Sequence, residues 1–152
     1  MLSFKESLKK LQNSKEFKGY MKKNPDAYIA NTIYLDTIEF NLFSPKTKIV
    51  TVFSVENNIT SKELDKENRI FPRLDLKKIK LDVDEIMKIF ENERLKICKD
   101  EVTKTIIILQ QDKEPVWNLS QLTSSIKILQ ILISAETGKV IESSYKRIIE
   151  KA

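Results

Sequence analysis

Two isoleucine-rich stretches constrain the fold more than any other part of this chain. One is Thr105 to Leu109, with the sequence TIIIL, and the other is Ile126 to Ser134, with the sequence IKILQILIS. Stretches with so many β-branched side chains favour strands over helices. Because successive side chains of a strand point to opposite faces, neither stretch keeps a purely polar side.

The apolar residues on both faces predict a sheet that is covered twice. Ile106 and Ile108 fall on one face, and Ile128 and Leu132 share a face in the second stretch. An antiparallel strand with one wet face should instead alternate apolar with polar residues. We therefore expect helices on one side of the sheet. The other side requires a sister repeat, a final helix or a second copy of the protein.

The remaining patterns predict an α+β protein in which helices pack on an antiparallel sheet. Ser3 to Lys23 reads as one kinked helix or two short ones, because Ser3 and Ser14 both fit N-cap positions. The segment 126–140, together with 103–111 and 115–118, is expected to be the hub of the sheet. In the first half, strands are expected at 28–35, 38–43, 48–55 and from Ile59. In the second half, a helix from Asp82 to Leu95 is followed by strands at 103–111, 116–119, 125–134 and 139–143. A short last helix is expected after them, capped by Ser143 or Ser144 and with Tyr145, Ile148 and Ile149 on one side.

The order helix, then strands, occurs twice and indicates an internal duplication. Residues 39–42 (EFNL) align with 116–119 (VWNL), and residues 48–55 align with 127–134. We accordingly divide the chain into a first unit at 1–65, a connecting segment at 66–81 and a second unit at 82–152 that ends in the short helix.

The second half resembles the PepSY family. The matching residues are Pro115-Val116-Trp117, as the family's strand-borne P-x-W, and the segment 133–140 (ISAETGKV), as its x-D-A-x-T-G-x-V hairpin. Ser134 stands where the family usually has Asp, and Gly138 supplies the turn. The resemblance covers 82–143, with a second copy placed at 3–60. It implies two cystatin-like units in tandem, each with a helix packed on an antiparallel sheet, and a role in inhibiting or regulating peptidases.

The chemistry of the side chains gives no catalytic constellation. The chain has no His, which removes Ser-His and Cys-His pairs and the usual base near neutral pH. Cys98 is read as a half-buried residue at a helix-to-strand turn. Helix capping accounts for Asp82, Asp84 and Glu85 without a metal. We expect no enzyme activity, no cofactor and no metal.

Charge and cysteine content indicate a cytoplasmic protein without a membrane segment. The net charge of +5 lies within residues 1–23, which hold seven lysines against two glutamates. Lysines at helical spacing are usually a solvated face, so nucleic acid is not the expected partner. The single Cys fits a reducing compartment, and no export signal or membrane span is visible.

The preferred function is that of a non-catalytic protein-binding or regulatory module that acts on a protein partner or on itself as a homodimer. The expected binding residues on a sheet face are Trp117, Ile106, Ile108, Ile128 and Leu132. One alternative is a basic protein associated with nucleic acid through Lys9, Lys15, Lys18 and Lys22. Another is a small-ligand binder with Trp117 in a cleft.

Overall fold

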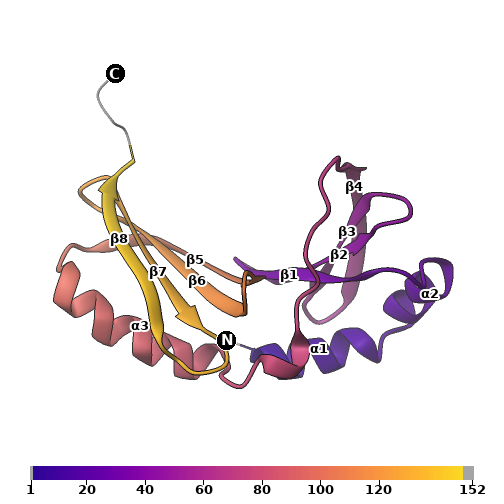
Figure 1. The fold of residues 1–152 in the computed structure, drawn as a ribbon, viewed down its shortest axis with the longest axis horizontal. Helices are drawn as coiled ribbons and strands as arrows, with labels where there is room; N and C mark the ends of the chain where they lie inside the picture. The colour runs from indigo at the N-terminus through magenta and orange to yellow at the C-terminus, as the bar shows by residue number, and fades with distance from the viewer. Residues whose placement is uncertain (1, 149–152) are drawn as a thin grey trace.

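The structure is a computed structural model that describes residues 2–148. It is an α+β fold with one antiparallel sheet and helices on one side of it (Figure 1). The elements in chain order are α1 (Phe4–Gln12), α2 (Lys15–Lys23), β1 (Tyr28–Tyr34), β2 (Ile38–Ser44), β3 (Ile49–Val55), β4 (Ile59–Lys66), the short 3-10 helix η1 (Leu76–Lys78), α3 (Val83–Ile97), β5 (Val102–Gln111), β6 (Pro115–Thr123), β7 (Lys127–Ser134) and β8 (Val140–Arg147).

All eight strands belong to a single sheet in the order β4-β3-β2-β1-β5-β6-β7-β8. Each half of the chain therefore forms a four-stranded meander, and the two meanders join where β1 pairs with β5. This seam is short and runs from Asn31 opposite Gln110 to Tyr34 opposite Ile107. Of the predicted hub, 103–111 is at the centre of the sheet as β5, beside β1. The prediction is wrong for 126–140, because β7 is one strand from the edge.

The first helical region is split, and both predicted caps are present. The Ser3 hydroxyl accepts the amide of Glu6 at 3.0 Å, and the Ser14 hydroxyl accepts the amide of Phe17 at 3.2 Å. Each cap satisfies an amide that the first turn of a helix leaves without a partner. Of the two predicted alternatives, one kinked helix or two short helices, the structure has two short helices that are separated at Asn13-Ser14.

One carboxylate joins the amino termini of two helices. Asp82 Oδ1 accepts the amide of Val83 at the start of α3 and that of Phe4 at the start of α1, both at 2.7 Å. Its Oδ2 accepts the amide of Lys5 at 3.1 Å. Because both helices point their positive ends at this group, its negative charge is favourable to each. Asp82 thus links the two halves on the helix side.

The main core lies between the helices and the sheet, and aromatic residues dominate it. Phe40 and Trp117, which the repeat alignment pairs, are both fully buried. Phe4 of α1 contacts both of these rings, with ring centroids 5.9 and 6.4 Å apart. Phe90 and Ile86 of α3 complete the layer. Because α1 contacts a strand from each half of the chain, the two halves share one continuous core.

The hairpin between β7 and β8 has the predicted glycine turn. Gly138 has a φ of +79°, and a Cβ there would lie 2.8 Å from Leu81 Cδ1. The hydroxyl of Ser134 accepts the amides of Glu136 and Thr137 at 3.2 and 3.1 Å. Ser134 therefore caps the turn with its oxygen, as an Asp at this position would.

The predicted last helix is wrong. Residues 140–147 form β8, which pairs with β7 along most of its length. Tyr145 and Ile148, expected on one helical stripe, belong to the strand and to the residue after it, while Ile149 lies outside the described residues. A helix this short is only marginally stable in water, whereas pairing with β7 makes the segment part of the sheet.

In the predicted repeat alignment, β2 and β6 have their aromatic residues buried on the same face of the sheet, but the next strand is out of register by one residue. Phe40 pairs with Phe53, and Trp117 pairs with Ile133. The equal-length alignment instead sets Phe53 beside Leu132, although these side chains point to opposite faces. A shift of one residue reverses the faces of a strand, so the correct comparison is Phe53 with Ile133.

Candidate binding surfaces

The face of the sheet opposite the helices carries no helix among residues 2–148, and we call it the open face. In Figure 1 the helices lie below the sheet, and the outer strands of both halves rise away from them. The prediction of two covered faces is therefore wrong for this chain alone. The other half of the chain extends the sheet sideways, and within the described residues β8 takes the place of the expected final helix.

A row of five carboxamides crosses the middle of the open face. Asn41 Nδ2 donates to Asn31 Oδ1 at 2.6 Å, and Asn31 is the register partner of Gln110 across the seam. Asn118 Nδ2 lies 3.4 Å from Gln110 Oε1, and Gln130 Nε2 donates to Asn118 Oδ1 at 3.1 Å. We name these five residues, on β2, β1, β5, β6 and β7, the amide row.

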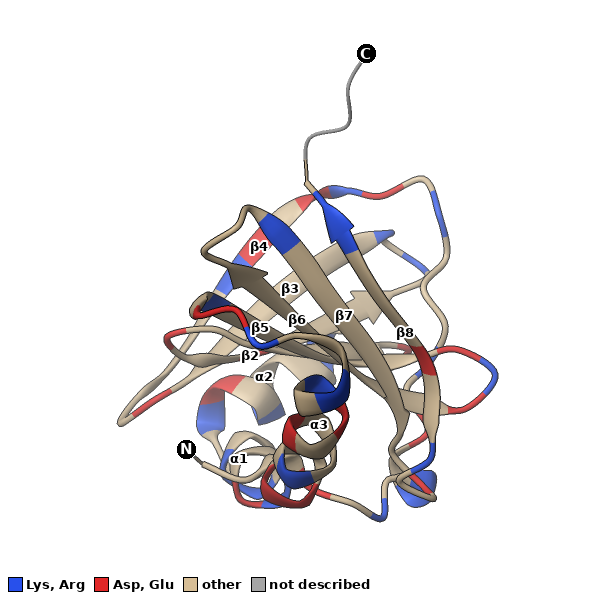
Figure 2. Cartoon of the chain, turned by 90° about the vertical axis from the view of Figure 1, so that its left-hand side faces the viewer, with Lys and Arg blue, Asp and Glu red and all other residues tan. Residues whose placement is uncertain are grey.

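The four isoleucine and leucine side chains predicted to share a binding face do so. Ile106 and Ile108 of β5 and Leu132 of β7 are half-buried, and Ile128 is 39% exposed. They lie beside the amide row, since Ile108 pairs with Asn118 and Asn118 pairs with Leu132. The centre of the open face therefore consists of aliphatic and carboxamide side chains. Figure 2 shows few charged residues on the middle strands.

Trp117 does not share this face, and its predicted place in a ligand cleft is wrong. Its side chain is 0% exposed and lies on the helix side of β6. The indole Nε1 donates to the carbonyl of Leu81 at 3.0 Å, and the ring packs against Tyr34 at 5.8 Å. Burial also raises the pKa of the Tyr34 hydroxyl, to which the charges of Asp82 and Asp84 add.

The segment after β4 covers one end of the open face. Phe71 packs on Phe43 with ring centroids 5.3 Å apart, and the Tyr28 hydroxyl donates to the Phe71 carbonyl. Ala30 and Val50 complete this small second core. The segment also lines a small pocket with Asn31 and Gln110 of the amide row. Asn118 and Gln130, farther along the row, do not line this pocket.

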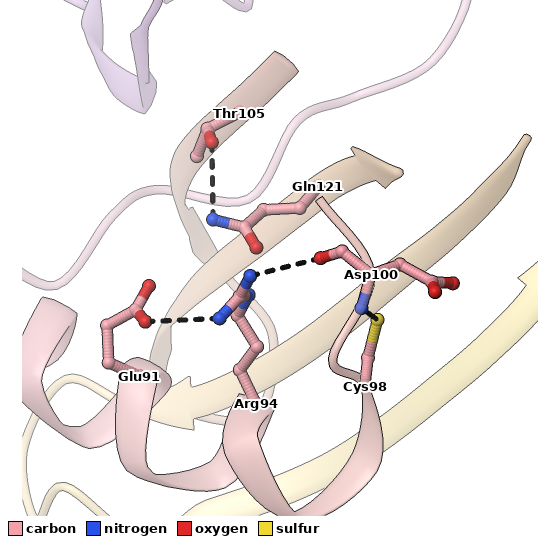
Figure 3. A network of polar contacts seen from close by, with 6 residues as sticks. All are labelled: Glu91, Arg94, Cys98, Asp100, Thr105 and Gln121. Atoms are coloured by element: carbon pink, nitrogen blue, oxygen red, sulfur yellow. Dashed lines mark hydrogen bonds and ion pairs between the residues drawn. The ribbon is translucent and has the colours of Figure 1, made fainter. Parts of the chain in front are cut away.

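Cys98 lies at the predicted turn between α3 and β5, but it is buried and not half-buried. It is 4% exposed, and its sulfur accepts the amide of Asp100 at 3.3 Å (Figure 3). Beside it, Arg94 donates from Nη2 to the Asp100 carbonyl at 3.2 Å and lies 3.5 Å from Glu91 Oε2. In Figure 3 the amide oxygen of Gln121 points toward the Arg94 guanidinium, and both groups help fill the end of the core under α3.

A hydroxyl cluster surrounds Asp100 at the outer end of β7 and β8. Ser125 Oγ donates to Asp100 Oδ2 at 2.6 Å, and the Tyr145 hydroxyl donates to the same oxygen. These two hydrogen bonds hold the pKa of the Asp100 carboxyl below its usual range. Thr123 lies 3.2 Å from Ser125 and closes the cluster. The Thr123 hydroxyl also donates to the carbonyl of Lys127 at 3.3 Å. The cluster thus links Asp100, which follows α3, to the strands β6, β7 and β8.

No metal-binding group of three or more His, Cys, Asp or Glu residues occurs within residues 2–148. Asp82 is occupied by the three backbone amides at the helix junction. None of the described helices is long and apolar enough to cross a membrane.

The lysines of the nucleic-acid alternative are all exposed. Lys9 lies on α1, and Lys15, Lys18 and Lys22 follow one stripe of α2. They lie on the helix side of the molecule, away from the open face.

Sequence reasoning missed the amide row. A usable signal was present, because Asn is depleted in strands and yet occurs in three predicted strands, and a Gln occurs in the interior of two more. Only the pairing of β1 with β5 brings the two halves of the row together.

Comparison with known proteins supports the fold. No protein-family model matches the chain, and no curated protein matches it. Among solved structures, the chain is similar to the crystal structure of a "putative lipoprotein" from Clostridium difficile 630, with a TM-score of 0.56 and 14% identity. The similarity covers 86% of this chain and 90% of that one. At this identity, the likeness shows the α+β antiparallel-sheet fold alone.

Proposed function

We propose that this chain is a non-catalytic protein-binding module whose docking surface is the open face. The observation that carries the proposal is the half-buried amide row with aliphatic side chains beside it, on a face that carries no helix among residues 2–148. The occupant is an uncharged stretch of a partner protein that lies across the central strands. The chain would regulate the partner protein by binding this stretch and keeping it from other contacts.

The amide row matches the hydrogen-bonding needs of a polypeptide. A carboxamide offers two N–H donors and an accepting oxygen, so it can bind both the N–H and the C=O of a peptide group. Neighbours within the row already use some of these groups, which fixes the orientation of the amides before a partner arrives. Preorganised side chains lose less conformational entropy on binding.

The aliphatic residues supply the rest of the expected binding energy. Ile108 and Leu132 are half-buried, so a partner need cover only the remaining part of each. Few charged groups stand among the middle strands (Figure 2), and a charged segment would lose hydration there without gaining an ion pair. The surface therefore favours a segment with aliphatic, Ser, Thr or amide side chains.

The two outer strands are poor alternatives for docking. β4 and β8 both carry charged residues, which discourage a further strand from pairing at an edge. These residues are Lys62, Glu63, Asp65 and Lys66 on β4 and Glu142, Lys146 and Arg147 on β8. Binding is thus directed to the face of the sheet.

The same proposal includes two PepSY-like units that share the sheet. Its support is the equivalence of β2 and β6: Phe40 and Trp117 are buried, while Asn41 and Asn118 both belong to the amide row. The glycine turn at Gly138 adds to the resemblance. Peptidase regulation is the activity that this resemblance suggests for the open face.

A peptide library displayed on phage tests the proposal directly. Selected peptides should be uncharged at their centre, and in NMR titrations they should shift the side-chain NH₂ signals of Asn31, Asn118 and Gln130. Ile108→Lys should abolish this binding, whereas Lys62→Gln on the edge strand should leave it unchanged. Peptides that shift only β4, β8 or the helices would refute the proposal.

Self-association is a distinct outcome of the same design. If a second copy occupies the open face, light scattering will show a mass that rises with concentration, and Ile108→Lys will return it to that of one chain. In such a homodimer, a second copy of the chain would bind the open face in place of a segment from another protein.

A further inference from the structure

A groove lies on the helix side of the molecule, away from the open face. It has a volume of about 780 Å³ and runs between α2 and residues 73–77, of which the last two belong to η1. The start of β1 and the end of β2 form its floor, with Ile29 and Leu42. Ligand pockets commonly enclose about 300–1,000 Å³, so the groove has room for a small molecule.

The walls of the groove are mostly apolar. Phe17 and Met21 of α2 face Leu74 of the connecting segment. Unlike α1 and α3, helix α2 has no fully buried residue, although Phe17, Tyr20 and Met21 form an apolar stripe. A stripe of this kind normally packs against a core. Here part of it remains accessible from the groove.

The rim of the groove carries positive charge. Arg73 and Lys77 line it and are exposed. Asp75 is the one acidic lining residue, and its carboxylate accepts the amide of Lys77 at 3.3 Å as the cap of η1. Two glutamines, Gln12 and Gln111, provide neutral polar groups. The two cations above an apolar floor are complementary to an anion with a hydrocarbon tail.

We infer that this groove binds an alkyl carboxylate of medium length. The chain lies against Phe17, Met21 and Leu74, and the carboxylate lies between Arg73 and Lys77. Charge-assisted hydrogen bonds to the two cations fix the head, since a guanidinium and an ammonium both bind carboxylates. The inference does not depend on the proposed function, because the groove and the open face share no residue of the amide row.

Methionine methyl groups provide a direct test. The chain has three methionines, of which Met21 lines the groove and Met87 lies on α3. In protein labelled with ¹³C at the methionine methyl, decanoate below its micelle concentration should shift the Met21 signal saturably. The Met87 signal should stay in place and reports any non-specific effect of the amphiphile.

Charge variants separate the head-group contact from the fold. Arg73→Gln with Lys77→Gln should weaken decanoate binding by roughly tenfold, as expected for the loss of about 1.4 kcal/mol. The matched double variant Lys18→Gln with Lys22→Gln removes the same charge from the solvent side of α2 and should not change the Kd. All four residues are exposed, so both proteins should fold.

Three results would overturn the inference. They are no saturable shift at Met21, equal shifts at Met21 and Met87, and binding of decyltrimethylammonium as tight as that of decanoate. An acidic peptide that displaces decanoate only through the rim cations would reassign the groove to a protein partner.

Discussion

Replacing Asp82 with Ala should destabilise the protein more than any other single change of a half-buried charge. The carboxylate accepts three backbone amides, from Phe4, Lys5 and Val83, at distances of 2.7 to 3.1 Å. It caps α3 and at the same time holds the first turn of α1. An alanine would leave two helix starts without their common acceptor.

The expected loss is about 3 kcal/mol. Losing an N-cap costs about 0.5–2 kcal/mol at Val83. The Phe4 amide is partly buried, and losing a charged acceptor there costs about 1.5–3 kcal/mol. The Lys5 amide is exposed, so water replaces most of its bond. For a domain of this size, 3 kcal/mol lowers the Tm by roughly 6–12 °C.

Urea and thermal unfolding followed by circular dichroism would measure the effect. Asp84→Ala is the matched control, because it removes the same charge from the first turn of α3 at an exposed position. It should cost no more than about 1 kcal/mol. Asp82→Asn keeps one accepting oxygen and should fall between the two. If Asp82→Ala and Asp84→Ala have the same free energy of unfolding, the carboxylate does not stabilise the junction.

Four further changes test other parts of the fold. Gly138→Ala should destabilise by about 1–3 kcal/mol in urea titrations, because the φ of +79° and the 2.8 Å approach both oppose a Cβ. Gly19→Ala, in a helix with open space around it, should instead stabilise by up to about 1 kcal/mol, and a loss there would contradict this reasoning. Ile126→Asn should stabilise by about 1 kcal/mol, since Ile126 is exposed at a φ of 59° that suits Asn better; a lower Tm would show that its side chain matters more than its backbone. Because the folded pKa of Asp100 is depressed, its hydrogen bonds with Ser125 and Tyr145 stabilise the fold above the normal carboxyl pKa and are lost as pH falls through the folded value. Asp100→Asn should therefore be less stable than wild type near neutral pH, with the difference shrinking below about pH 4, and a pH-independent difference would refute this linkage.

Local patterns in the sequence predicted most of the secondary structure. Ser3, Ser14 and Asp82 cap the helices that they were expected to begin. The alternation of Ile106 and Ile108 with their neighbours correctly separated two faces of β5. These features depend on neighbours along the chain, which is why one sequence suffices to find them.

The errors concern residues whose state depends on distant partners. Tyr145 follows a short polar segment that could suit a helix, and only pairing with β7 makes it a strand. Trp117 was correctly placed on a strand, but which face is buried depends on where α1 and α3 pack. Likewise the pairing of Asn31 with Gln110 brings the amide row together, and no local pattern specifies it.

The seam between β1 and β5 has a consequence for the order of events in folding. Within each half, every strand pairs with the one before it, so each meander can form by closing short loops. Tyr34 and Ile107 meet only after a loop of about half the chain has closed, at a larger entropic cost. Two partly formed halves should therefore precede the joined sheet, and the rate of the last step should depend on the seam strands and on Asp82.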